Sequence, residues 1–352
     1  MVARLRRLAG AAAGALLLLL GLSSQERVEP KTPVRAAFAD GKLWLLSEEG
    51  EVYSISDTAR GATRAPVADG LDLCILGGAP TVVAGKRDKP PFWRIRRRAG
   101  SAWKEVARVA SRGESFVAFA CADTRAVVLT SHRLIEISGS RQREVRLSGQ
   151  VVPAIVGTTA YMSADKLFVG FNVGEWGGGL VRIGRASGEV RHLERNVSGD
   201  LCGGPLNSGC DPVNGFAAEP WKADCVVAAI GLVHLAPHGR LIELCGDRVE
   251  RIYFKPFELG WPDQDRRLDN GEPFSTVAFF GVASAGGSLW AIGIDGLYRV
   301  TGPGRAEFTP LPKFREVGGF QVSFDIPGIA LALTGMNGRA AMSGTVPIMA
   351  VR

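Results

Sequence analysis

The segment that decides the fold runs from Lys166 to Arg195 and reads KLFVGFN (166–172), VGEWGG (173–178), GLVRIGR (179–185), a short turn, and EVRHLER (189–195). Within it, Val181-Arg182-Ile183 alternates apolar and polar side chains. Alternation with a period of two is typical of a strand that turns one face toward a core. We therefore predict three antiparallel strands here, with an unusual loop at Val173–Gly178 between the first two.

The same apolar–polar–apolar triplet returns along the chain, in most copies after a more continuous apolar run such as Leu43–Leu46 or Leu289–Ile292. The steps between triplets are roughly 40 to 65 residues, and about 40–45 residues is typical of a four-stranded propeller blade. Loop insertions account for the longer steps. An antiparallel sandwich with chance similarity between hairpins is the alternative. The triplets are Tyr53-Ser54-Ile55, Trp93-Arg94-Ile95, Ile135-Glu136-Ile137, Val181-Arg182-Ile183, Val233-His234-Leu235 and Tyr298-Arg299-Val300.

The repeat predicts an all-β chain folded as a β-propeller of about seven four-stranded blades, with six blades as the alternative count. The last stretch, Phe320–Arg352, is interpreted as a seventh, degenerate blade that pairs with a strand from the N-terminal region. Such closure is expected because an open ring would leave an exposed sheet edge. The propeller domain is expected to cover residues 34–352.

The N-terminus has the layout of a secretory signal peptide. Arg4, Arg6 and Arg7 precede an apolar stretch, Ala9–Leu22, which two serines follow. We predict a signal peptide at residues 1–24 and a linker at 25–33, hence a periplasmic or extracellular protein. The apolar stretch is too short for a comfortable membrane span, so no stable membrane insertion is expected after signal removal.

All six cysteines lie beyond the signal. An even number of cysteines in an exported chain favours disulfides, although six cysteines allow fifteen pairings. No C-x-x-C spacing supports a zinc site. We expect one bridge between the first strands of neighbouring blades, one that closes a loop, and one within a blade. These are Cys74–Cys121, Cys202–Cys210 and Cys225–Cys245, in that order.

The charge of the chain argues against nucleic acid as the main partner. The formal net charge is +7, and three of these positive charges lie in the predicted signal. The mature protein is therefore only mildly basic, and an exported protein rarely meets nucleic acid.

The long insertions are expected on one face of the ring. In a blade, the loop between the second and third strands shares a face with the link from the fourth strand to the next blade, because each hairpin reverses the chain. Val173–Gly178 and Lys86–Pro91 belong to the first kind of loop, and residues 196–214 and 248–273 to the second. Loops on a rigid scaffold concentrate binding residues, so this face is the candidate site.

Candidate ligand-binding residues combine aromatic rings with carboxylates and amides. Such a set suits a glycan or a peptide, since rings cover apolar faces while polar groups take directional hydrogen bonds. Alternatively, the carboxylates could hold Ca²⁺, although the oxygen-rich run Pro262–Glu272 lacks the order of a calcium loop. The candidates are Asn172, Glu175, Trp176, Asp211, Asn214, Glu219, Trp221, Trp261 and Asp263.

No catalytic signature is present, and we assign no catalytic residue. The chain has neither a G-x-S-x-G elbow nor a P-loop, and its four histidines are not spaced as metal pairs. The sequence favours a binding or scaffolding module for a glycan, a peptide or an envelope protein. The alternative is a propeller enzyme of lyase, lactonase or hydrolase type that uses Glu175, Asp211 or Glu219, with or without Ca²⁺.

The triplets and their spacing resemble the β-propeller repeat proteins that bacteria export. The resemblance covers nearly all of the mature chain and is generic. The sequence lacks the terminal Trp-Asp of WD40 repeats, the paired glycines of kelch repeats and the S-x-D-x-G-x-x-W boxes of sialidases. No catalytic residue is therefore carried over from any of these families.

Overall fold

The computed structural model describes residues 33–56, 62–155, 157–197, 202–234, 236–258, 267, 271, 273–311, 320–324, 328–334 and 348–351. The predicted signal peptide and all of the predicted linker except Pro33 lie outside these residues. The regular structure consists of strands β1 to β27 and one three-residue 3₁₀ helix, η1. None of the described helical structure is long and apolar enough to cross a bilayer.

Six sheets have four antiparallel strands each, in chain order from the inside of the ring to its rim. The first three blades are β1 (Pro33–Ala39), β2 (Lys42–Ser47), β3 (Val52–Ser56) and β4 (Thr63–Arg64); β5 (Gly70–Leu76), β6 (Ala79–Ala84), β7 (Phe92–Ala99) and β8 (Ala102–Ala110); and β9 (Phe116–Ala122), β10 (Arg125–Thr130), β11 (Arg133–Ser138) and β12 (Arg141–Arg146). The next three are β13 (Gly157–Met162), β14 (Lys166–Asn172), β15 (Leu180–Gly184) and β16 (Val190–Leu193); β17 (Val213–Ala218), β18 (Val226–His234), β19 (Ala236–Cys245) and β20 (Arg248–Tyr253); and β21 (Phe279–Ala285), β22 (Ser288–Gly293), β23 (Gly296–Gly302) and β24 (Arg305–Pro310).

The C-terminal segment forms a smaller sheet. It contains β25 (Phe320–Ser323), β26 (Ile329–Thr334) and β27 (Ile348–Val351), and the described residues supply no fourth strand. The expectation of seven four-stranded blades is therefore not supported. The alternative of six four-stranded blades is what the structure shows, with the three-stranded sheet beside them.

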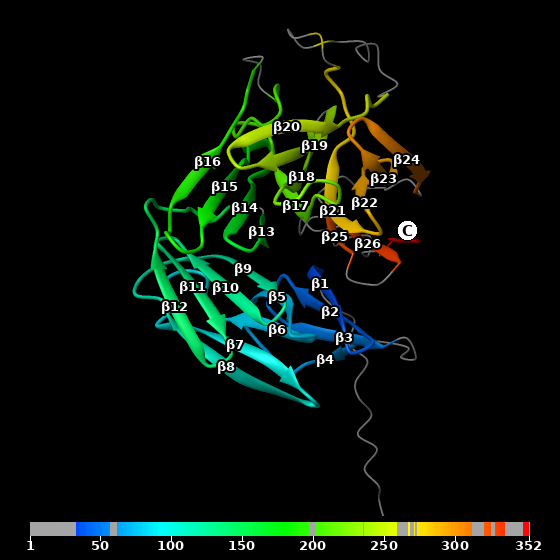
Figure 1. Ribbon diagram of the computed structural model, residues 1–352. Coiled ribbons are helices and arrows are strands. Elements are labelled where there is room, and N and C mark those ends of the chain that lie inside the picture. Colours follow the sequence, from blue (N-terminus) through cyan, green and yellow to red (C-terminus); the bar gives the residue numbers. More distant parts are fainter. Residues whose placement is uncertain are drawn as a thin grey trace, which may run out of the picture.

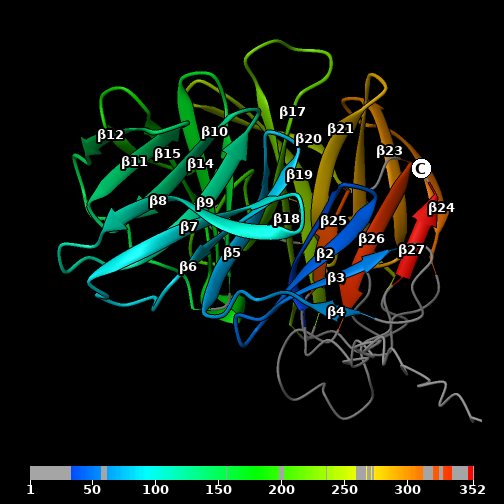
Figure 2. The same ribbon diagram turned by 90° about the horizontal axis from the view of Figure 1, so that it is seen from below.

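The sheets stand around one axis, as the views along and across it show (Figures 1 and 2). The innermost strands contact one another in the order β1, β5, β9, β13, β17, β21, β25 and back to β1. The first and last sheets thus meet through β1 and β25. Each sheet packs against the sheets before and after it around the ring. In a sandwich, two sheets would instead pack face to face, so the alternative of an antiparallel sandwich is excluded.

The hydrophobic core lies between neighbouring blades. Along β10, Val127 and Leu129 pack toward the fourth blade, while Val128 between them packs toward the second. Alternate side chains of one strand therefore bury themselves against two different sheets. Each such buried aliphatic side chain contributes about 1.5–3 kcal/mol. Trp44 and Trp93 are among the largest fully buried side chains and belong to two of these clusters between blades.

Five of the six triplets lie on the third strand of a blade, where the repeat predicts them. The exception is Val233-His234-Leu235: Val233 and His234 end β18, a second strand, and Leu235 lies outside the described residues. The hairpin of β18 and β19 is longer than its counterparts, with residues paired up to His234 and Ala236. The fifth blade consequently ends at Tyr253, and Arg248–Tyr253 is its outer strand rather than part of a link.

All three expected disulfides are present. Cys74–Cys121 joins β5 to β9 with a Cα–Cα distance of 5.9 Å, and Cys202–Cys210 closes a loop between β16 and β17 with 4.9 Å. Cys225–Cys245 joins the facing ends of β18 and β19 with 4.6 Å. The described residues contain no free cysteine.

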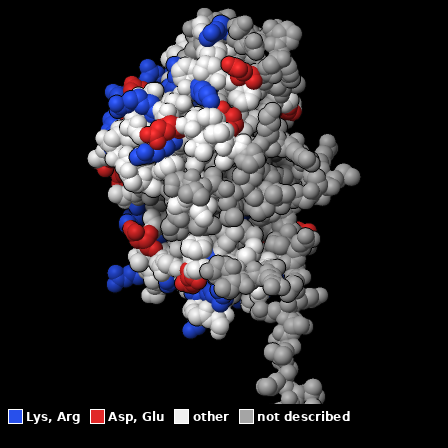
Figure 3. Space-filling model, turned by 90° about the vertical axis from the view of Figure 1, so that its right-hand side faces the viewer, with Lys and Arg blue, Asp and Glu red and all other residues white. Residues whose placement is uncertain are grey.

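Charged side chains of both signs lie near one another on the side shown in Figure 3. Ion pairs such as Arg299 with Glu307 and Arg248 with Glu250 join opposite charges on the third and fourth strands of blades. The described part of this side therefore presents no continuous field of one sign.

Candidate functional site

The long loops lie on one face of the ring, as predicted from the alternation of hairpin turns between the two faces. This face, called the long-loop face below, carries the β14–β15 loop with η1 (Gly174–Trp176), the β6–β7 loop, the β18–β19 hairpin and the links between blades. The links enter the innermost strands here, so the long-loop face also holds the mouth of the space around the axis.

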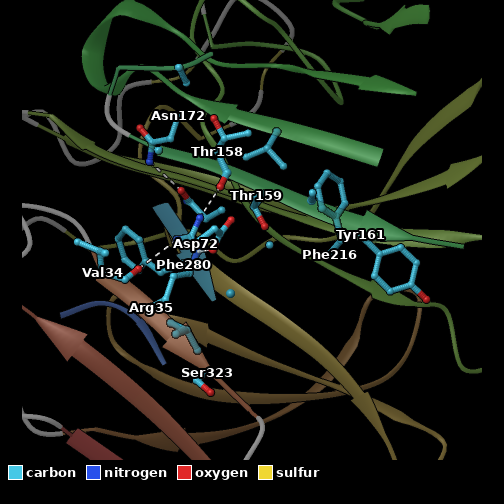
Figure 4. Close-up of a pocket in the computed structure, with 18 of the residues that line it drawn as sticks. Val34, Arg35, Asp72, Thr158, Thr159, Tyr161, Asn172, Phe216, Phe280 and Ser323 are labelled. Atoms are coloured by element: carbon cyan, nitrogen blue, oxygen red, sulfur yellow. Dashed lines mark hydrogen bonds and ion pairs between the residues drawn. The ribbon is translucent and has the colours of Figure 1, made fainter. Parts of the chain in front are cut away.

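A central cavity of about 1500 Å³ lies along the axis. Innermost strands from all the sheets line it, together with Gly174 and Glu175 of η1 and the tip of the β18–β19 hairpin. Figure 4 shows side chains from several blades pointing into this space. Polar groups inside it include Arg35, Asp72, Thr158 and Ser323.

Arg35 reaches across the cavity from the first blade. Its Nε lies 2.9 Å from Asp72 Oδ1 of the second blade, and its Nη2 donates to the Thr158 carbonyl oxygen of the fourth at 2.6 Å (Figure 4). Asp72 is buried and also accepts the backbone N–H of Leu73 at 2.9 Å. One guanidinium thus links three blades inside the ring, an arrangement that the sequence did not reveal.

Asn172 and Asn214 lie together at the mouth of the cavity, and their amide groups hydrogen-bond to each other and to the backbone. Asn172 Nδ2 donates to Asn214 Oδ1 at 2.9 Å, and Asn172 Oδ1 accepts the Gly174 N–H at 2.9 Å. Asn214 Nδ2 donates to the carbonyl oxygens of Gly231 and Phe279 at 2.8 and 2.9 Å. These bonds position η1 relative to the fifth and sixth blades.

Glu175 and Trp176 are neighbours in η1, but only Glu175 lines the central cavity. Glu175 Oε2 lies 2.8 Å from His234 Nδ1 at the tip of the β18–β19 hairpin, and both residues line the cavity. The Trp176 side chain is 79% exposed. His234 was not predicted as a site residue, because its triplet was assigned to a strand interior rather than to a hairpin tip.

Four apolar side chains on the long-loop face are largely exposed. Val152 and Ile155 belong to the link between the third and fourth blades, and they are 65% and 90% exposed. Trp176 of η1 and Val197 of the next link, which is 67% exposed, complete the group. These four, here called the blade-four surface, are the most exposed of the large hydrophobic residues that the structure describes.

A second, mainly apolar cavity of about 580 Å³ lies beside the blade-four surface. Val152, Phe171, Leu193 and Ser208 are among its lining residues. Pro153–Ile155 lines both this cavity and the central one, so the two spaces share a wall. This link was not predicted as part of the site. The feature of the sequence that could have indicated it is the apolar run Val151–Ile155, which lies in the link between the third and fourth blades and not in a strand.

Asp211 is fully buried and is not presented to a ligand. Its Oδ2 accepts the backbone N–H of Asn207 at 2.6 Å and pairs with Arg240, while His238 Nε2 lies 3.7 Å from Oδ1. Burial raises the pKa of Asp211 to about 6, although Arg240 opposes the shift. Burial, with a smaller effect of Arg240, lowers the pKa of His238 to about 4. The group anchors the loop that Cys210 closes.

Glu219 and Trp221 lie on the opposite face of the ring, so their predicted place on the long-loop face is wrong. They belong to the turn between β17 and β18, a first-to-second strand connection. Trp221 packs against the core between the fifth and sixth blades. Burial and the adjacent Glu243 raise the pKa of Glu219 to about 7. The predicted site residues Trp261 and Asp263 lie outside the described residues.

The comparisons with known proteins identify the fold alone. No protein-family model matches the chain, and no curated protein matches it by sequence. YCF48 in a structure bound to D1 peptide is similar, with a TM-score of 0.52 and 11% identity over 86% of this chain and 90% of that one.

Two further solved structures have the same level of similarity. The computationally designed Ika8 protein has a TM-score of 0.51 and 10% identity over 88% of this chain and 82% of its own. The β-propeller domain of Cps50 (Swd1) from Myceliophteria thermophila has a TM-score of 0.50 and 11% identity over 87% and 95%. These similarities agree with the propeller fold described above.

Proposed function

We propose that this chain is an exported binding module whose long-loop face docks an extended segment of a partner polypeptide. The blade-four surface supplies the apolar anchor points, and the mouth of the central cavity supplies the polar ones. The single observation that carries the proposal is that Val152, Ile155, Trp176 and Val197, which all lie in connections on the long-loop side of the fourth blade, are the most exposed large apolar side chains of the described residues.

Exposed apolar groups that gather in one place mark interaction surfaces in soluble proteins. Covering an exposed aliphatic or aromatic side chain contributes about 1.5–3 kcal/mol, so several together can hold a peptide. Trp176 is the expected hot spot, because tryptophan dominates the binding free energy at many interfaces. The adjoining apolar cavity offers space for a side chain of the partner beside Ile155.

The chemistry of the surface favours a polypeptide over a glycan. Val152, Ile155 and Val197 are aliphatic and offer no hydrogen bonds, whereas glycan sites combine aromatic rings with a dense set of polar groups. YCF48, a propeller of similar architecture, is known in a structure with a bound peptide. Three disulfides support an exported location, hence an envelope or secreted partner.

The enzymatic alternative finds less support among the described residues. Of its three carboxylates, Glu175 lies at the cavity mouth beside His234, Asp211 is buried against Arg240, and Glu219 lies on the other face. They do not converge on one substrate position, as acid–base catalysis requires. The same separation argues against these three as joint ligands of one Ca²⁺ ion.

A random-peptide library displayed on phage tests the proposal, followed by calorimetry with the selected peptide. We expect Trp176→Ala and Ile155→Ser each to weaken binding by about 10-fold or more, the usual effect at a hot spot. Val106→Ser is the matched control, because Val106 is also exposed but lies on an outer strand. Equal affinities of all three variants, or failure to select any peptide while a glycan array gives a ligand, would contradict it.

A further inference from the structure

Two cysteines and two carboxylates meet at the end of the fifth blade that lies opposite the long-loop face. One ligand atom from each of Glu219, Cys225, Glu243 and Cys245 lies within 4.8 Å of the corresponding atoms of the others. None of these four residues belongs to the central cavity or the blade-four surface, so a site formed by them is independent of the proposed peptide site.

The strand register brings the four residues together. Val226 of β18 pairs with Leu244 of β19, so Cys225 and Cys245 flank this pair at the ends of the two strands. Glu243 precedes Cys245 by two residues, and strand residues two apart point to the same side of a sheet. Glu219 is held across the turn, where its backbone N–H donates to the Cys225 carbonyl oxygen at 3.0 Å.

The carboxylates of this group are buried and incompletely partnered. Glu219 is 6% exposed, and neither of its carboxylate oxygens makes a hydrogen bond of good geometry among the described residues, although the Glu243 carboxylate and the Trp221 indole lie close enough to affect its pKa. Glu243 is 5% exposed and pairs with Lys222 Nζ at 2.7 Å. An unpartnered buried carboxylate is costly, which points to a ligand for the Glu219 oxygens.

We propose that reduction of the Cys225–Cys245 disulfide turns this group into a four-ligand site for a thiophilic divalent cation such as Zn²⁺. Two thiolates and two carboxylates form a ligand set that zinc accepts in tetrahedral geometry. With bonds of about 2.3 Å to sulfur and 2.0–2.2 Å to oxygen, the ligand atoms of such a site lie about 3.3–3.8 Å apart. The four ligand atoms, which now lie within 4.8 Å of one another, would have to move slightly closer together, and the two sulfur atoms would have to move apart once their bond is broken.

The redox step is a thiol–disulfide exchange with a dithiol reductant. The dithiol transfers two electrons and two protons to Cys225 and Cys245 and itself becomes a disulfide. When the cation binds, the two thiols release their protons to solvent and become thiolates. Oxidation reverses both events and expels the metal. This end of the β18–β19 strand pair is thus held by a covalent bond in one state and by a cation in the other.

Cobalt titration of the full-length chain tests the site. The protein is reduced with a phosphine, desalted without oxygen and titrated with Co²⁺, whose thiolate complexes show a charge-transfer band in the near ultraviolet. We expect reduced wild type to bind one more equivalent than Cys225→Ser/Cys245→Ser, and Zn²⁺ to displace it. The oxidised protein should show no such band, which provides a comparison that needs no substitution.

Conservative variants test the carboxylates. Glu219→Gln and Glu243→Gln should each weaken Co²⁺ binding at least 10-fold, because loss of even an outer-shell partner costs roughly 10–100-fold in affinity. Glu250→Gln is the matched control, since Glu250 lies on β20 of the same blade outside the group. Equal cobalt uptake by reduced wild type and the double serine variant would overturn the proposal. Unchanged affinity in both glutamine variants would overturn the four-ligand set.

Discussion

Replacing Gly178 with alanine should separate the loop that carries Trp176 from the loop that Cys202–Cys210 closes. A Cβ atom at Gly178 would meet the Asp211 carbonyl oxygen, and it would lie 2.5 Å from the Phe171 carbonyl oxygen and 2.6 Å from Pro212 Cα. All three are backbone atoms, so no side-chain rotation relieves the clash. The loop has to move away as a unit.

The expected cost combines overpacking with lost hydrogen bonds. Gly178 N–H donates to the Ser208 carbonyl oxygen at 2.9 Å, and Gly179 N–H donates to that of Asp211 at 2.8 Å. Each bond contributes about 0.5–1.5 kcal/mol. Forcing extra atoms into a packed region costs about 1–3 kcal/mol. We therefore expect Gly178→Ala to lower the free energy of unfolding by about 3 kcal/mol.

Urea unfolding followed by circular dichroism measures this change. Gly149→Ala is the matched control, because a Cβ atom there meets nothing within 4 Å and the residue has no positive φ. At such a position alanine is expected to be neutral or to stabilise by about 0.4–1 kcal/mol. If the two variants unfolded within about 1 kcal/mol of each other, the close packing of the two loops would be refuted.

Two further outcomes are expected from buried charges. Arg35→Met should lower the free energy of unfolding by about 2 kcal/mol, because it leaves the Asp72 carboxylate buried without its guanidinium; a loss under about 0.5 kcal/mol in urea unfolding would show that this ion pair does not hold the blades. Burial lowers the pKa of His238 from its ordinary 6.5 to about 4 in the folded protein. Between pH 4 and 6.5 the unfolded chain therefore binds a proton that the folded protein does not, and the free energy of unfolding rises with pH. The wild type should gain roughly 3 kcal/mol over His238→Asn from pH 4 to 6.5, and a constant difference between the two would contradict burial of a neutral imidazole.

Local patterns were sufficient for most of the strands and for the cysteine pairs. The alternation at Ile135-Glu136-Ile137 predicts a third strand because a pleated strand needs only its own sequence to present two faces. Once blades are counted, Cys74 and Cys121 take equivalent places on neighbouring first strands, so their pairing is expected. The same reasoning failed at Val233, because hairpin length depends on how far the partner strand continues.

The candidate site was predicted only in part. Trp176 could be placed on the long-loop face, since the parity of hairpin turns settles the face of each loop. Trp221 was assigned to the wrong face because the turn after β17 connects a first strand to a second strand, and such turns lie on the face opposite the long loops. Ile155 was missed because an apolar residue in a link is buried in most folds, and its exposure depends on whether another segment covers it.

The sequence by itself determined a chain of short antiparallel sheets, their approximate limits, the three disulfides and the face on which long loops accumulate. It could do so because side-chain alternation and turn parity are properties of consecutive residues. The tertiary structure alone decided which groups lie at the axis and which stay uncovered: the bridge from Arg35 to Thr158 joins residues 123 positions apart. Such contacts, and the exposure of the blade-four surface, arise only when the ring has closed and distant blades share one space.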